Sequence, residues 1–301
     1  MKRSATPITL WGGPALAIGA GVAWSLGSVA ARMADEADAW QYLLWRSVAI
    51  IVVVEVLHRR RAARSALVQA FTSGGRMLVG CATLLLASVS FVYAIKNTVA
   101  ANAAFLASVS PLVAVLFGRV VLGERLTRTT IAAMAVAFGG LAVMVIGDVS
   151  AGTMTGNMSA LLSAVGTAGY AVCIRSRPNA DWTPVLPGYG VMMIVLCGLV
   201  TMVRHRPLVP PVEDVGYALF HGGVLIVVGT IWFNRASRTV AAVPMTIFAQ
   251  SEMVFVPVWV FLKFGEQPKA TTILGGVIVL AAVVGKAVLE NRLGVPEPVS
   301  V

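Results

Sequence analysis

Ten long apolar runs, separated by short charged segments, constrain most strongly what this chain can fold into. Eight of the runs contain no Asp, Glu, Lys or Arg, and the other two contain one charged residue each, Arg46 and Glu252. A helix that spans a bilayer needs about 20 apolar residues, with a range of roughly 17–25. The chain is therefore predicted to be an all-α integral membrane protein with ten transmembrane helices, in residues 4–31, 39–54, 77–95, 97–118, 129–147, 149–174, 182–203, 215–234, 239–262 and 270–285.

The composition and the placement of charges favour a membrane protein over a nucleic-acid-binding protein. The chain is 58% hydrophobic and 12% charged, with a mean hydropathy of +0.85, far above that of a soluble domain. The net charge of +10 comes from residues that lie between the apolar runs, as in the loops of membrane proteins. We expect membrane lipid around the helices and no nucleic-acid partner.

The distribution of Lys and Arg predicts the orientation of the chain. Sixteen of these residues fall at the two termini and in the loops after the second, fourth, sixth and eighth runs, whereas six fall on the opposite side. The cluster at residues 58–64 contributes most, and we interpret it as a topology signal rather than a lipid or nucleic-acid site. By the positive-inside rule, both termini are expected in the cytoplasm.

Residues 93–130 are echoed by residues 235–272, and the two segments align without a gap. In this alignment, whose constant shift we call the repeat offset, Ala107 matches Ala249, and the pair Gly123-Glu124 matches Gly265-Glu266. Each Gly-Glu pair stands at the end of an apolar run beside basic residues. We interpret these pairs as turns, with their glutamates in salt bridges rather than in binding.

The repeat also predicts the relation between the two halves of the chain. The repeat offset covers five predicted spans, an odd number, so the second copy would enter the membrane in the opposite direction. The chain would then comprise two inverted five-helix repeats, residues 1–148 and 149–301. Secondary transporters commonly use such repeats and bind substrate near the membrane midplane between them. Both repeats lie in one chain, so a monomer would suffice, although an oligomer is also compatible with the sequence.

Several short motifs resemble the EamA branch of the drug/metabolite transporter superfamily. They are Ala23-Trp24-Ser25-Leu26-Gly27-Ser28, Arg46, Pro111, Gly123-Glu124-Arg125, Glu252 and Gly265-Glu266. The family often has a proline after the glutamate of the ninth span, where this chain has Met253. Within the branch, the chain is most similar to the bacterial aromatic amino-acid exporters. The resemblance implies an inner-membrane protein with a central cavity lined by spans 1–4 and 6–9, and with spans 5 and 10 at the back.

The repeat and the resemblance together predict a secondary transporter that exports amino acids, aromatic ones in particular, or similar small metabolites by alternating access. The sequence contains no Gly-rich phosphate loop, metal-spaced His/Cys set or nucleophile motif. We therefore expect no enzymatic activity, no metal and no cofactor, and transport that is either facilitated or coupled to a proton. The alternatives are a carrier or exchanger of other metabolites, drugs or nucleotide-like solutes with the same fold, and a membrane scaffold without transport.

Glu252 and Arg46 stand inside predicted spans, where a charge costs about 3 kcal/mol on insertion scales. Each side chain should therefore face protein or water. Glu252, which replaces Ser110 of the first repeat, either contacts a substrate amine or a coupling proton, or forms a structural pair with Arg46. Arg46 either anchors a substrate carboxylate, stacks beside Trp45, or extends toward the outer face.

Helical spacing and residue type suggest further cavity residues. On the fourth span Asn102 and Phe105 share a face with Leu106 and Val109, at spacings typical of one helix face. Aromatic and hydroxyl side chains elsewhere either line the cavity or pack at membrane interfaces. His221 is interpreted as a packed polar residue rather than a proton relay. The candidate substrate-binding residues are Trp24, Ser28, Arg46, Ser90, Tyr93, Asn102, Phe105, Tyr170, Phe248, Ser251 and Glu252.

Overall fold

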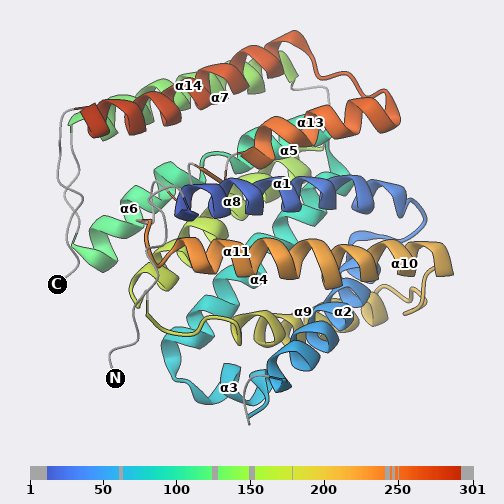
Figure 1. Ribbon diagram of the computed structural model, residues 1–301. Coiled ribbons are helices and arrows are strands. Elements are labelled where there is room, and N and C mark those ends of the chain that lie inside the picture. Colours follow the sequence, from blue (N-terminus) through green and yellow to red (C-terminus); the bar gives the residue numbers. More distant parts are fainter. Residues whose placement is uncertain are drawn as a thin grey trace, which may run out of the picture.

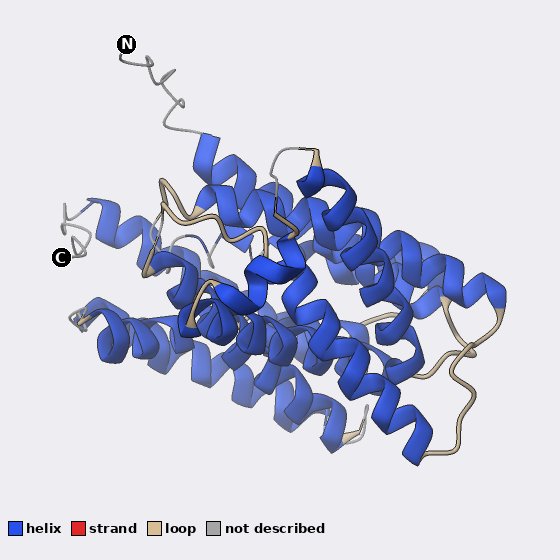
Figure 2. Ribbon diagram, turned by 90° about the horizontal axis from the view of Figure 1, so that it is seen from below, coloured by secondary structure: helices blue, strands red, loops and turns tan. Residues whose placement is uncertain are grey.

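A computed structural model describes residues 12–60, 64–123, 128–148, 153–177, 179–240, 245, 248–249 and 251–292, and all the regular elements in these ranges are helices (Figures 1 and 2). In chain order they are α1 (Gly12–Met33), α2 (Ala39–Arg59), α3 (Ala66–Thr72), α4 (Gly75–Asn97), α5 (Ala100–Ala107), α6 (Ser110–Leu122), α7 (Arg128–Asp148), α8 (Met154–Arg175), α9 (Val185–Val203), α10 (Val212–Phe220), the π-helix η1 (His221–Ile226), α11 (Val227–Ala236), α13 (Ser251–Phe264) and α14 (Ala270–Arg292).

Seven stretches of the described chain are long and apolar enough to cross a membrane. They cover seven of the ten predicted spans: Gly12–Met33, Ala39–Arg59, Gly75–Asn97, Asn102–Leu122, Met154–Arg175, Val185–Val203 and Val212–Ala236. The other three predicted spans contain shorter apolar helical stretches, which lie in α7, α13 and α14. The predicted cytoplasmic location of the termini and the predicted salt bridge of Glu124 concern residues that lie outside the described ranges.

The fourth predicted span is two helices rather than one. The chain turns at Ser108 and Val109, between α5 and α6. Pro111 explains the break, because proline has no N–H to donate and its ring would collide with the carbonyl group of Ala107 in a continuous helix. The Ser108 hydroxyl donates to the Phe105 carbonyl at 2.5 Å and helps to close α5. The ends of the two short helices consequently meet in the middle of the span.

The sequence repeat is also a repeat of local structure. Helices α1 and α8 end at Met33 and Arg175, which match at the repeat offset. Gly123 and Gly265, which also match, adopt left-handed φ angles of 70° and 68°. Glycine enters this region without the steric cost that a Cβ imposes, so each glycine ends an apolar helix at low cost.

The helices pack in a bundle with one separate pair. Helices α7 and α14 lie side by side along one edge of the molecule (Figure 1). In the remainder, α4 packs on α8, α2 on α9, and α1 on both α11 and α13. Glycine permits close contact between these helices: a Cβ at Gly166 of α8 would lie 2.7 Å from the Ala87 Cα of α4. Such close backbone approach is how membrane helices gain packing energy.

Candidate functional site: a cavity between the repeats

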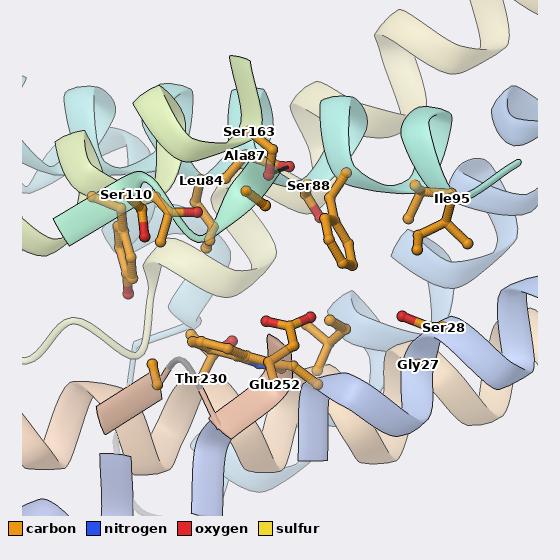
Figure 3. Close-up of a pocket in the computed structure, with 18 of the residues that line it drawn as sticks. Gly27, Ser28, Leu84, Ala87, Ser88, Ile95, Ser110, Ser163, Thr230 and Glu252 are labelled. Atoms are coloured by element: carbon orange, nitrogen blue, oxygen red, sulfur yellow. Dashed lines mark hydrogen bonds between the residues drawn. The ribbon is translucent and has the colours of Figure 1, made fainter. Parts of the chain in front are cut away.

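A cavity of about 1040 Å³, including the open space at its mouth, lies inside the bundle (Figure 3). Its wall is formed by residues of α1, α2, α4, α5, α6, α8, α9, η1, α11 and α13. Among the described residues, α7 and α14 contribute nothing to the wall. This is the arrangement that the family resemblance implies. The mostly apolar wall suits a small organic molecule.

Equivalent positions of the two repeats line this one cavity. Leu84 and Ser88 of α4 have Ile226 and Thr230 as their counterparts at the repeat offset, and all four lie on the wall. Hydroxyl groups thus face the cavity from matching places in both halves. Among the described residues, the paired wall positions are Ser28 with Tyr170, Leu84 with Ile226, Ser88 with Thr230, Phe91 with Phe233, Ala107 with Ala249, and Ser110 with Glu252.

Arg46 of α2 places a positive charge on the cavity wall. The residue is only 2% exposed, and its Nη2 donates a hydrogen bond to the Ser88 hydroxyl of α4. Its Nε is buried, and no acceptor for it is found among the described residues. Gly222 of η1 presses against this part of α2, since an added Cβ would lie 2.9 Å from the Arg46 Cγ. The guanidinium is therefore held inside the bundle with unused hydrogen-bonding capacity.

Glu252 places a negative charge on the cavity wall. It lies on α13, and its carboxylate points into the cavity toward the wall that carries Leu84 and Ala87 (Figure 3). No hydrogen bond or ion pair to this carboxylate is found within the described ranges, where the ion pairs are Arg32–Glu266 and Arg59–Glu55. The pairing with Arg46 weighed from the sequence is thus not found there.

His221 also lies on the wall, in the π-helical turn η1. Its Nδ1 is 2.8 Å from the hydroxyl oxygen of the fully buried Tyr42, and its ring packs against Gly27 of α1. These contacts are those expected of a packed polar residue. Short π-helical segments frequently mark functional sites in helices.

Aromatic rings form the apolar part of the cavity. The rings of Trp24 and Phe233 have centroids 5.2 Å apart, and Tyr170 stacks on Phe233 with centroids 6.2 Å apart. The Tyr170 hydroxyl donates to the Asn234 side-chain oxygen at 2.5 Å, which fixes this ring. Gly229 makes room for the indole of Trp24, because an added Cβ would lie 2.7 Å from its Cδ1. The cluster offers an aromatic, mostly apolar surface to a ligand.

The structure places five of the eleven candidate residues on the cavity wall: Trp24, Ser28, Arg46, Tyr170 and Glu252. The other six are not part of the wall, because their side chains face away from the cavity. Ser90 and Tyr93 are on another face of α4 from the wall residues, and the Tyr93 ring lies 6.0 Å from that of Trp40. The Ser251 hydroxyl donates to the Ile18 carbonyl at 2.8 Å and joins α13 to α1.

On α5 the wall is formed by small residues rather than by the bulky stripe expected from the sequence. Ala104 and Ala107 face the cavity, whereas Phe105 is directed at Gly276 of α14. An added Cβ at that glycine would lie 2.5 Å from the Phe105 Cζ. Asn102 is buried outside the wall, and Phe248 packs partly buried against the core.

Several wall residues were not among the candidates, most notably Ser88, Thr230, Phe91, Phe233 and Tyr189. The first four were detectable in principle. They are identical or chemically similar residues at equivalent positions of the repeat, with Ser88 and Phe91 on a stripe of α4 and Thr230 and Phe233 on a matching stripe of α11. Comparing the repeats position by position along the third and eighth predicted spans would have selected them.

Comparisons with known proteins bear on the whole chain. The model of the EamA-like transporter family matches residues 11–146 and 154–286. The chain is 29% identical, over 195 residues, to the pseudopaline exporter of each of two Pseudomonas aeruginosa strains, which covers 64% of this chain and 68% of the relative. It also resembles a solved crystal structure with 17% identity, over 93% of this chain and 98% of the other, with a TM-score of 0.70. The structural likeness supports the fold alone.

Proposed function

Because this chain belongs to the EamA-like transporter family, we propose that it exports amino acids, aromatic amino acids in particular, or similar small metabolites across the bacterial inner membrane. It is a multi-pass membrane protein whose family and relatives are those of a transporter of small metabolites rather than of an enzyme. The direction of transport follows the relatives, whose name describes them as exporters of pseudopaline.

The observation that carries the proposal is the cavity lined by equivalent positions of both repeats. In our proposal, the repeats 1–148 and 149–301 are inverted five-helix units in a ten-helix chain, with both termini in the cytoplasm. Two similar halves around one site form inward-facing and outward-facing states of comparable energy, as alternating access requires. One chain holds both halves, so a monomer is sufficient for the cycle.

The chemistry of the wall supports an amino acid as the substrate. An aromatic cluster around Trp24 and Phe233 suits an apolar side chain, while Arg46 and Glu252 suit charged ends. A nucleotide-like or phosphorylated solute would call for several cations, and among the described wall residues Arg46 is the one Lys or Arg. Glu252 is also the group that we propose to exchange a coupling proton, because its carboxylate faces the cavity (Figure 3).

Flux assays in proteoliposomes test the proposal. Vesicles that contain the purified protein are loaded with labelled phenylalanine, tyrosine, tryptophan and non-aromatic amino acids, with and without a proton gradient. We expect flux above that of protein-free vesicles, with preference for aromatic substrates, and stimulation by the gradient. Absence of amino-acid flux would refute the amino-acid substrate, and gradient-independent flux would refute proton coupling.

A further inference from the structure

Two side chains of opposite charge share the cavity, and neither has an ion-pair partner among the described residues. Arg46 is nine-tenths or more buried, has one hydrogen bond to Ser88, and leaves its Nε without an acceptor among the described residues. The Glu252 carboxylate has no hydrogen-bond or ion-pair partner in the same part of the chain. An uncompensated charge at this depth is costly, and a ligand group of opposite charge offsets part of that cost.

The two charges stand where the repeats differ. Arg46 has Gly188 as its counterpart at the repeat offset, and Glu252 has Ser110. Part of the surrounding wall is matched between the halves, with Ser88 and Thr230 at equivalent positions of the repeat. The matched part of the wall can form two equivalent states, whereas the charged pair gives the cavity a fixed polarity. A ligand with two different ends can therefore bind in one orientation only.

We propose that the cavity binds a zwitterion in a fixed orientation, with its carboxylate on Arg46 and Ser88 and its ammonium group on Glu252. This inference deepens the proposed function and rests on it. A guanidinium presents several N–H donors in a plane that matches a carboxylate, and a carboxylate accepts hydrogen bonds from an ammonium group. The aromatic cluster of Trp24, Tyr170 and Phe233 then receives the rest of the molecule.

The same geometry discriminates against ligands with a single charge. A ligand with only a positive charge can bind Glu252, but Arg46 repels it and gains no partner. A ligand with only a negative charge can bind Arg46, but Glu252 repels it and gains no partner. Each missing charged hydrogen bond costs about ten-fold or more in affinity. Selectivity for both charged ends together is thus the property that distinguishes this site from an apolar pocket that accepts any aromatic molecule.

Binding measurements on the purified protein in detergent test the inference apart from transport. Isothermal titration with phenylalanine is compared with its methyl ester, which lacks the carboxylate, and with N-acetylphenylalanine, which lacks the ammonium group. The wild-type protein is expected to bind each analogue about ten-fold or more weakly than phenylalanine. Because this comparison needs no substitution, it stands even if a cavity variant fails to fold.

Two substitutions assign the ends. Arg46→Gln is expected to bind phenylalanine no better than the methyl ester, but still better than N-acetylphenylalanine. Glu252→Gln is expected to bind phenylalanine no better than N-acetylphenylalanine, but still better than the methyl ester. The matched controls are Arg204→Gln and Glu213→Gln, which remove the same charges from exposed positions outside the wall and should change neither preference.

The possible results separate this inference from the proposed function. Equal binding of the three ligands, a reversed assignment of the two substitutions, or no binding of any of the twenty amino acids would overturn the zwitterion site. Charge-selective binding without flux in proteoliposomes would support the site and refute transport. Amino-acid flux that ignores both charged ends would support transport and overturn the site.

Discussion

Gly27 of α1 lies directly against the His221 ring on the cavity wall, and its replacement by alanine should destabilise the protein. An added Cβ would lie 2.7 Å from the His221 Cε1 and 2.9 Å from its Cδ2, closer than carbon atoms pack. The ring cannot move freely, because its Nδ1 is bound at 2.8 Å to the hydroxyl group of the fully buried Tyr42. The substitution therefore forces either the ring or α1 to shift.

The expected cost follows from three contributions. Overpacking of a core position costs about 1–3 kcal/mol, and weakening the buried hydrogen bond costs about 1 kcal/mol. Alanine gains roughly 0.5–1 kcal/mol over glycine in a helix, which offsets part of this. The net loss is then about 1–3 kcal/mol, which corresponds to a melting temperature lower by on the order of 5 °C.

Thermal unfolding of the purified protein in detergent, followed by tryptophan fluorescence, measures this effect. In a His221→Ala background the ring is gone, so Gly27→Ala should no longer lower the melting temperature. Gly216→Ala is the control, because an added Cβ there meets nothing within 4 Å. An undiminished loss in the His221→Ala background, or no loss in the single variant, would refute the packing argument.

Three further substitutions test other contacts. Glu252→Gln should lower the rate or affinity of transport and alter its pH dependence in proteoliposomes, and no change in any of these would make Glu252 a packing residue. The Glu266 carboxylate accepts a hydrogen bond from the Ala100 backbone N–H at 2.8 Å, so Glu266→Ala should lower the free energy of unfolding by about 1 kcal/mol. Glu266→Gln keeps an acceptor oxygen and should lower it by less. Equal losses in the two variants would contradict this helix-capping role. Tyr170→Phe removes the hydrogen bond to Asn234 and should cost about 1 kcal/mol in the same assay, and an unchanged melting temperature would show that the bond contributes nothing.

Much of the architecture was accessible from the sequence. The apolar runs located the seven long apolar helices of the described chain, and the repeat predicted turns at Gly123 and Gly265, where the structure has left-handed φ angles. The salt bridge expected of Glu266 is present, to Arg32 at 3.3 Å. The break before Pro111 was not anticipated, although the proline itself marked the place. A proline in an apolar run either kinks or interrupts a helix, and the surrounding packing decides between these outcomes.

The inward faces of the helices were much harder to predict. Phe91 lines the cavity while Phe105 packs toward α14, and nothing in their residue type separates them. On α4, Val79 is 54% exposed although Leu84, in the same apolar run, is on the wall. Lipid is as apolar as a protein core, so hydrophobicity does not distinguish the outside of a membrane helix from its inside.

The sequence by itself determined where helices must form, that the chain repeats itself, and that two charges stand within apolar runs. It did so because a bilayer penalises both unpaired backbone groups and isolated charges, and each penalty leaves a clear pattern in the residues. Tertiary structure alone decided that Arg46 and Glu252 face one cavity without pairing, and which small residues open it. That decision depends on close packing, such as that of Gly27 on His221, which acts between residues far apart in the chain.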